Sequence, residues 1–110
     1  MAAITVQQIA LAGLTPSAAA AASGGGDTFV NNGLTFLEVT NGGGSSINVT
    51  VAGAQACSQG STHDNVVAVG AGATKLIGPF PASRFNNPAT GAASVTYSSA
   101  TSVTVRAFSL

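Results

Sequence analysis

Three residue types that carry chemistry lie close together, because Cys57, His63 and Asp64 fall within eight residues of the chain. Each type can bind a metal ion or take part in nucleophilic catalysis. A structural zinc site, however, normally needs four ligands at paired spacings, and the chain holds one cysteine and one histidine. A Cys–His pair would have only the adjacent Asp64 to orient it, and neighbouring side chains of an extended segment point in opposite directions. We therefore expect no metal, no cofactor and no catalytic role here, only a buried cysteine beside an exposed polar loop.

The three acidic residues, Asp27, Glu38 and Asp64, are the only candidates for acid–base chemistry by paired carboxylates. Glu38 lies within an apolar segment, and burial without a partner would raise the pKa of its carboxyl. Such a glutamate more often faces the outer side of a sheet or pairs with an arginine, here Arg84 or Arg106. We therefore expect that the protein is not an enzyme, and we assign no catalytic residue.

Charged residues are rare, with three basic and three acidic side chains making up 5% of the chain and a net charge of zero. Typical soluble domains carry about 25% charged residues. A nucleic-acid-binding protein needs several cations to neutralise phosphates, and a polybasic membrane patch needs a cluster of them. The sequence also contains no run of about 18 apolar residues. We therefore expect neither nucleic acid nor membrane as a partner.

The single cysteine excludes an intramolecular disulfide framework and favours assembly in a reducing compartment. The first fourteen residues contain no Lys or Arg, so they lack the positive region of a signal peptide. We expect a soluble, unprocessed chain.

Short strands must position these side chains, because apolar and polar residues alternate in several places. In Ile47–Val51 every second residue is apolar, which predicts a strand with one buried face. The same pattern predicts that Tyr97 points inward and that Arg106 points to solvent or to a partner. Leu34–Val39 is apolar on both faces, which is typical of a strand covered on both sides. The predicted strands are residues 4–6, 34–39, 47–51, 66–69, 75–77, 94–98 and 103–107.

Clusters of glycine and asparagine separate these strands and predict turns. Strands that recur about every 8–12 residues with such turns are typical of an all-β protein, here a single small antiparallel β-sandwich or barrel with an extended N-terminal segment. Residues 1–26 would form an N-terminal arm and an Ala/Gly-rich loop, and residues 27–110 the core. The alanine run Ala18–Ala22 is too short for a stable isolated helix, so we expect at most one turn or an ordered loop there.

The segment after residue 76 is the most individual part of the chain, because Gly78 and three prolines stiffen it. Two phenylalanines and an arginine in a rigid loop have the composition of a binding anchor. Alternatively, the phenylalanines fold back and cap the core, which we favour for Phe80. We keep Pro79, Arg84 and Phe85 as candidate interface residues.

Composition also predicts assembly. More than half of the residues are Ala, Gly, Ser or Thr, so burial offers small side chains while glycine raises the entropy cost of folding. A surface almost without charge lacks the repulsion that keeps concentrated proteins apart. Both the low expected stability of a monomer and the lack of charge repulsion matter less where identical copies or a larger lattice cover the surface. We therefore expect a homo-oligomer.

An ordered set of short motifs along nearly the whole chain resembles small structural proteins of tailed-bacteriophage virions, most closely the capsid decoration, or cement, proteins. The motifs are Ile4–Gln8 leading into Leu14–Pro16, Gly33–Leu37 followed by Asn41–Gly43, Ile77–Phe80, and Val95–Ser98 before Val103–Val105.

This resemblance implies a small β-rich protein in the virion, a dimer or trimer that binds the outside of the shell and braces it against internal DNA pressure. Its partner would be the major capsid protein, and the family has no catalytic residues to transfer. The extended N-terminal residues, with Ile4 and Val6, could add a strand to a neighbouring sheet edge. Together with Arg106 they complete our candidate interface.

Two other functions remain open. A neck or tail component of the virion would share the same motifs. A carbohydrate-binding or adhesive β-sandwich usually displays exposed aromatic platforms, but this chain has no Trp and one Tyr, which is predicted to point inward.

Overall fold

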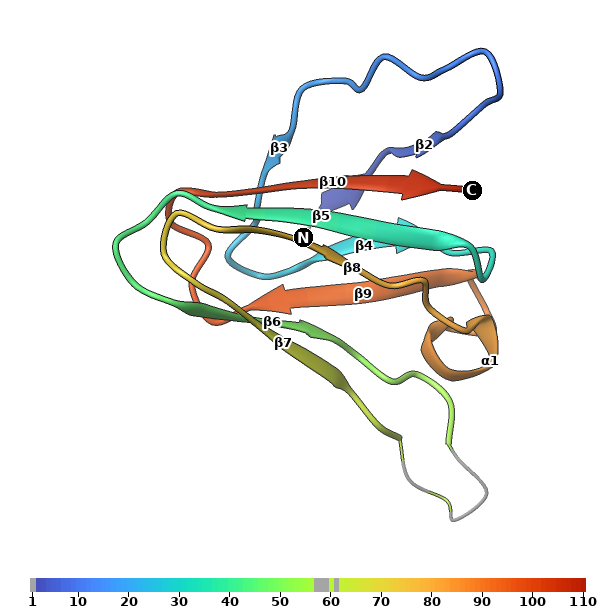
Figure 1. Cartoon of the computed structure of the whole chain (residues 1–110). Helices are drawn as coiled ribbons and strands as arrows, with labels where there is room; N and C mark the ends of the chain where they lie inside the picture. Colours follow the sequence, from blue (N-terminus) through green and yellow to red (C-terminus); the bar gives the residue numbers. More distant parts are fainter. Residues whose placement is uncertain (1, 57–59, 61) are drawn as a thin grey trace.

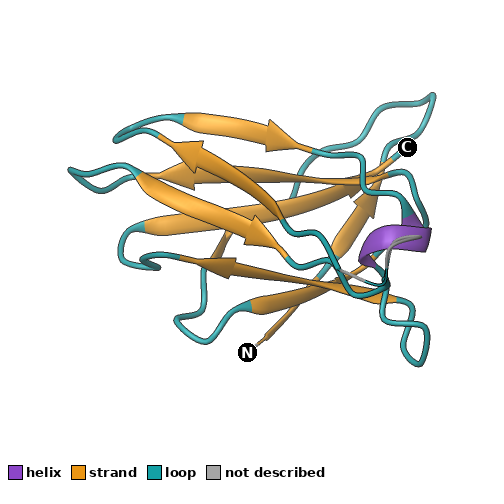
Figure 2. Ribbon diagram, turned by 90° about the horizontal axis from the view of Figure 1, so that it is seen from below, coloured by secondary structure: helices purple, strands orange, loops and turns teal. Residues whose placement is uncertain are grey.

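Two five-stranded sheets pack face to face in this protein (Figure 1). The computed structural model describes residues 2–56, 60 and 62–110. Sheet A has the order β1 (Ala2–Ile4), β4 (Asp27–Val30), β9 (Ala92–Tyr97), β6 (Ile47–Val51) and β7 (Asn65–Val69). Sheet B has the order β2 (Val6–Gln8), β10 (Val103–Ser109), β5 (Thr35–Asn41) and β8 (Thr74–Ile77), and β3 (Ala20–Ala21) also pairs with β10. One short helix, α1 (Ala82–Phe85), lies at one end of the two layers (Figure 2).

The predicted all-β class is confirmed, the sandwich is found rather than the alternative barrel, and one correction concerns the strand directions. The sheets do not close into a barrel. The pairing is also not purely antiparallel, because β1 runs parallel to β4 and β2 runs parallel to β10. Parallel neighbours need a long connection, and residues 5–26 supply one between β1 and β4.

The alternating pattern located most of the strands. On β6, Ile47, Val49 and Val51 are buried, as predicted. The predicted strand at residues 4–6 instead divides at Thr5, so that β1 joins sheet A and β2 joins sheet B. We did not predict β4, whose four residues begin with an aspartate directly after three glycines.

The alanine run forms neither a helical turn nor only a loop. Ala20 and Ala21 pair as β3 with Val105 and Thr104 of β10, and the next residue, Ala22, donates its backbone N–H to the Val103 carbonyl oxygen at 2.9 Å. Exposed alanines bury little apolar surface, so a helix here would have no packing to hold it. Instead of forming a helix, the segment makes backbone hydrogen bonds to the adjacent strand β10.

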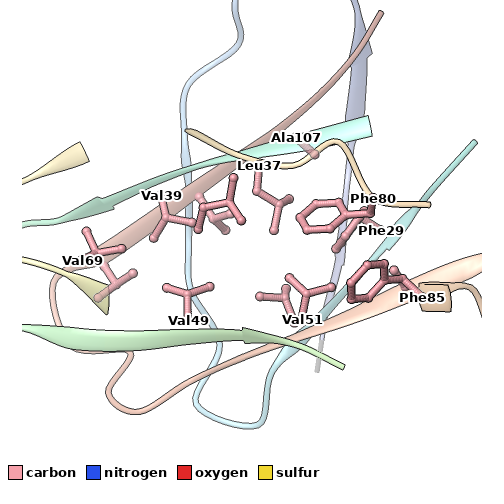
Figure 3. Close-up of a cluster of buried hydrophobic side chains, with 14 of the residues drawn as sticks. Phe29, Leu37, Val39, Val49, Val51, Val69, Phe80, Phe85 and Ala107 are labelled. Carbon is pink, nitrogen blue, oxygen red and sulfur yellow. The ribbon is translucent and has the colours of Figure 1, made fainter. Parts of the chain in front are cut away.

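The core lies between the two sheets (Figure 3). Leu37 and Val39 of sheet B face Val49 and Val51 of sheet A, and all four are fully or almost fully buried. Three phenylalanines fill the end of the core nearest α1: the ring centroids of Phe29 and Phe80 are 5.5 Å apart, and those of Phe80 and Phe85 are 5.4 Å apart. These rings are the largest apolar side chains in a core otherwise built mostly of valine, with leucine, isoleucine and alanine.

The N-terminal arm, residues 2–22, closes one side of the sandwich. Its first strand extends sheet A, and β2 and β3 extend sheet B, so the arm joins the two sheets along one side. On the opposite side, β7 and β8 are the outermost strands and nothing in the described chain pairs with their free edges.

Candidate functional site

The loop between β6 and β7 carries the cluster that could have been a metal or catalytic site. Cys57 lies outside the described residues, and His63 and Asp64 are exposed. The Asp64 carboxylate accepts a hydrogen bond from the Gly53 backbone N–H at 2.9 Å, so it ties the two sides of the loop together. Among the residues that the structure describes, no three His, Cys, Asp or Glu side chains lie close enough to hold a metal ion.

A buried carboxylate joins two strands of sheet A. Asp27 is 1% exposed, and its Oδ2 accepts hydrogen bonds from the Tyr97 hydroxyl at 2.8 Å and from the Ser23 backbone N–H at 3.2 Å. Only glycine fits before it, because Gly26 has φ +93° and a Cβ there would lie 2.8 Å from the Val95 carbonyl oxygen. The pair therefore fixes the loop that leads into β4.

The two groups shift each other's pKa. Burial raises the pKa of Asp27, but the hydrogen bonds from Ser23 and Tyr97 outweigh burial, and the pKa lies below its ordinary value. Burial, and then the adjacent carboxylate, raise the pKa of Tyr97 well above its ordinary value. The packing of Tyr97 against the core and its bond to Asp27 confirm that it points inward. The raised pKa keeps the hydroxyl protonated at neutral pH, so the pair is a structural contact rather than a proton donor.

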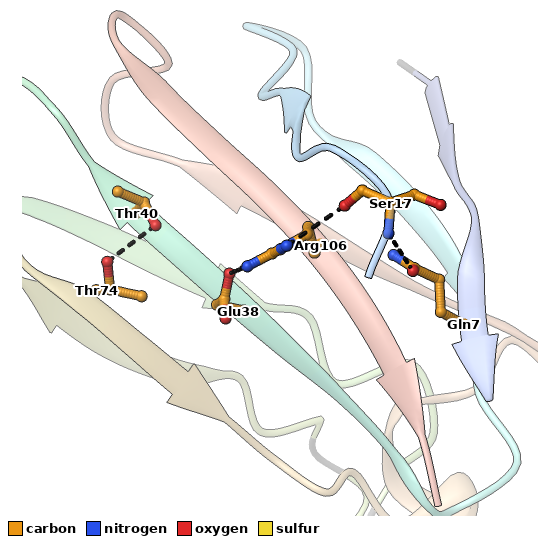
Figure 4. A network of polar contacts seen from close by, with 6 residues as sticks. All are labelled: Gln7, Ser17, Glu38, Thr40, Thr74 and Arg106. Carbon is orange, nitrogen blue, oxygen red and sulfur yellow. Dashed lines mark hydrogen bonds and ion pairs between the residues drawn. The ribbon is translucent and has the colours of Figure 1, made fainter. Parts of the chain in front are cut away.

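An ion pair lies on the outer face of sheet B (Figure 4). Arg106 donates two hydrogen bonds to Glu38 Oε1, from Nε at 2.8 Å and from Nη2 at 2.5 Å, which confirms the expected arginine partner for this glutamate. Its Nη1 donates to the Ser17 carbonyl oxygen at 3.3 Å, and the Ser17 backbone N–H donates to Gln7 Oε1 at 2.7 Å. Arg106, a candidate interface residue, therefore holds the N-terminal arm against β10 and β5.

The three candidate interface residues in the rigid segment around α1 differ in their exposure to solvent. Pro79 and Arg84 are exposed, but Phe85 is 2% exposed and belongs to the core, so it presents no anchor to a partner. The Arg84 guanidinium carbon Cζ lies 4.6 Å from the centroid of the Phe85 ring, so the arginine covers this ring. Arg84 Nε also donates a hydrogen bond to the His63 carbonyl oxygen at 3.1 Å. The prediction that Phe80 caps the core is confirmed.

The arm residues Ile4 and Val6 are half-buried and pack against the protein's own core. Their strands add to edges of the same chain rather than standing free. Each of these two strands therefore already has one partner strand within its own chain.

A groove of about 300 Å³ on the outer face of sheet B was not predicted. It lies beside the Glu38–Arg106 pair, where the Phe36 and Phe108 rings are 5.7 Å apart and Leu76 is 67% exposed. The groove is lined by Ile9, Leu14, Pro16, Phe36, Glu38, Leu76 and Phe108. The signal was present in the double-sided apolar pattern of β5, which we interpreted as complete cover on both faces, whereas Phe36 is only half-buried.

The outer face of sheet A differs, because its outward-facing residues are uncharged. Many cross-strand neighbours there are hydroxyl or small side chains, such as Thr28 beside Ser94 and Thr50 beside Thr96, and two exposed valines, Val30 and Val66, lie among them. Neither an aromatic ring nor an ion pair lies on this face among the described residues.

Comparison with known proteins adds no relative, since no family model, curated protein or solved structure matches the chain. Within the described residues, no helix has the length and apolar character needed to cross a membrane.

Proposed function

We propose that this chain is a structural protein of a bacteriophage virion that binds the outer surface of the capsid and stabilises the shell. Its partner is the major capsid protein, and the site of contact is the apolar groove on the outer face of sheet B, named here the sheet B groove. Several copies act together on each particle.

The sheet B groove is the observation that carries this proposal. Apolar side chains that face solvent as a group are typical of protein contact sites. Phe36, Phe108 and Leu76 come from three adjacent strands, so the groove has a rigid floor. Ile9 and Leu14 of the arm form one wall, and Arg106 holds that arm in place through Ser17.

The use of the few charged groups supports a structural role. Asp27 bonds Tyr97, Glu38 bonds Arg106, and Arg84 bonds the loop before β7. These side chains hold the protein together. Because these charged side chains make contacts within the protein, the surface left for a partner consists mainly of apolar and hydroxyl side chains. Such a surface is compatible with contacts that are repeated by the symmetry of a shell.

Weak contacts become tight retention when they are repeated. A shell presents the same binding surface many times, and linked copies raise the effective concentration of each additional contact. One groove of this size per protomer is then sufficient to retain the protein on the shell, because an oligomer binds the shell more tightly than one protomer does.

Leu76→Ser tests the proposal, because Leu76 is 67% exposed and its loss leaves the core intact. Co-sedimentation with empty capsids of the phage that encodes the protein should show binding weakened about tenfold or more, with the melting temperature unchanged. Val30→Ser is the matched control, since Val30 is equally exposed but lies on sheet A. It should leave capsid binding unchanged.

Three results would overturn the proposal. Wild-type protein that binds a glycan but does not bind empty capsids would indicate an adhesive module. Binding to neck or tail assemblies instead of shells would place the protein elsewhere on the particle. Equal loss of capsid binding in the Leu76 and Val30 variants would show that the groove is not the contact.

A further inference from the structure

In the part of the chain that the structure describes, the sandwich has four free sheet edges, and three of them carry features that discourage pairing with another chain. The arm-side edges are strands of two or three residues, and very short edge strands offer few hydrogen bonds. On β8, Lys75 lies opposite the buried Val39, so this charge is on the inward side of an edge strand, and Pro79 follows shortly after. Each is a recognised protection against edge-to-edge association.

The fourth edge, β7, has none of these protections. Its five residues, Asn65–Val69, contain no charge and no proline. Val66 is 57% exposed on the outer face, and Val67 is half-buried against the core. An uncharged valine-rich edge is a template for another strand.

The register shows which backbone groups of β7 are free. Asn48 of β6 hydrogen-bonds Ser98 through both its N–H and its carbonyl, on the side of β6 away from β7. Since neighbouring residues of a strand alternate in the side to which their backbone groups point, Val49 bonds toward its partner Val67. The backbone groups of Val66 and Ala68 therefore point away from sheet A, and within the described chain no backbone hydrogen bond outside the strand ladders uses them.

We propose that β7 pairs antiparallel with β7 of a second copy of this chain, in a two-fold dimer centred on Val67. Val66 of one copy then lies opposite Ala68 of the other, and the two free N–H and two free carbonyl groups on each side form four hydrogen bonds. The large and small side chains of these two positions fit beside each other. The result is one continuous sheet of ten strands.

The charges near β7 favour a second copy in this orientation. Asp64 and Arg84 lie at one end of the strand, and Gly70, Ala71 and Gly72 lie at the other. Antiparallel pairing puts Asp64 opposite Gly70 of the second copy and separates the two Asp64 side chains by about 20 Å, at about 3.4 Å per residue. The outer face of sheet A carries no charged side chain among the described residues, so this face does not repel the same face of the second copy. The dimer requires no capsid, so it goes beyond the proposed function.

A charge exchange at positions 66 and 68 tests the dimer. In the proposed register these positions face each other, so Val66→Lys with Ala68→Lys places like charges opposite on both sides, and Val66→Glu with Ala68→Glu does the same. Each double variant alone should self-associate at least about tenfold more weakly than wild type in sedimentation velocity from micromolar to millimolar concentration. An equimolar mixture should restore association, because each lysine then meets a glutamate.

The matched control is Thr74→Lys with Leu76→Lys, which puts the same charges at the same spacing on the exposed β8 edge. This variant should dimerise like wild type. The proposal is wrong if wild-type protein stays monomeric over the whole range. It is equally wrong if the lysine variant at 66 and 68 associates normally, if the mixture stays monomeric, or if the β8 control also loses association.

Discussion

Sheet A turns its one carboxylate into the core, whereas sheet B turns its carboxylate outward. Asp27 is 1% exposed and bonds a tyrosine hydroxyl, while the Glu38 side chain is 21% exposed and bonds an arginine. The outer face of sheet A is consequently uncharged, and that of sheet B carries an ion pair beside an apolar groove.

From this difference we expect burial, rather than charge, to decide how much each contact contributes to the free energy of unfolding. If Asp27 is removed, the partly buried Tyr97 hydroxyl loses its hydrogen-bond partner, and an unsatisfied buried group costs about 1–3 kcal/mol. If Glu38 is removed, the Arg106 guanidinium still reaches water and the Ser17 carbonyl. Exposed ion pairs contribute about 0–1 kcal/mol.

The largest effect is therefore expected for Asp27→Ala. It should lower the free energy of unfolding by about 2–3 kcal/mol in urea denaturation, because both the Tyr97 hydroxyl and the Ser23 backbone N–H lose their acceptor. Glu38→Ala, the corresponding change on sheet B, should cost less than about 1 kcal/mol. Equal losses would remove the distinction between the two sheets.

At alkaline pH, the next largest effect comes from Tyr97. An unfolded tyrosine loses its proton near pH 10, but the folded state keeps it because burial and Asp27 raise the pKa of Tyr97. This contribution is fully present below about pH 10, and above it stability falls by up to about 1.4 kcal/mol per pH unit. Thermal unfolding of Tyr97→Phe should show a flatter decline above pH 10 than wild type. An identical decline in both proteins would contradict the assignment.

A smaller effect of opposite sign is expected in acid. Because the pKa of Asp27 is lowered in the folded state, the unfolded chain, with an aspartate pKa of about 3.9, takes up the proton first. Stability from this group is therefore present above about pH 4 and is lost as the pH falls through the folded-state pKa. Asp27→Asn should remove that part of the acid loss in urea titrations, and Glu38→Gln should leave it in place.

The sequence predicts what periodicity encodes. The alternation of Ile47–Val51 and the inward direction of Tyr97 were read from spacing alone, and Arg106 was one of two partners considered for Glu38. These predictions depend on local pattern and on the scarcity of charges. They required no knowledge of the neighbours of each strand.

The features that were missed depend on contacts between distant segments. The division of the arm at Thr5 follows from two parallel pairings with strands more than twenty residues away. The sheet B groove needs Ile9 and Phe108 side by side, and the sequence left Phe85 open between core and interface because only packing decides whether a loop ring turns inward. Spacing along the chain contains none of this information.

The smallest expected effect is the coupling between Glu38 and Arg106. A double-mutant cycle with Glu38→Gln and Arg106→Gln should give a coupling free energy of about 0.5–1 kcal/mol, because both side chains remain partly exposed. The matching cycle on sheet A, with Asp27→Asn and Tyr97→Phe, should give a larger value. Raising the salt to about 1 M, where the screening length is about 3 Å, should shrink the first coupling and leave the second nearly unchanged. A sheet B coupling that resists salt and equals that of sheet A would mean that the arm shields the ion pair as fully as the core shields Asp27.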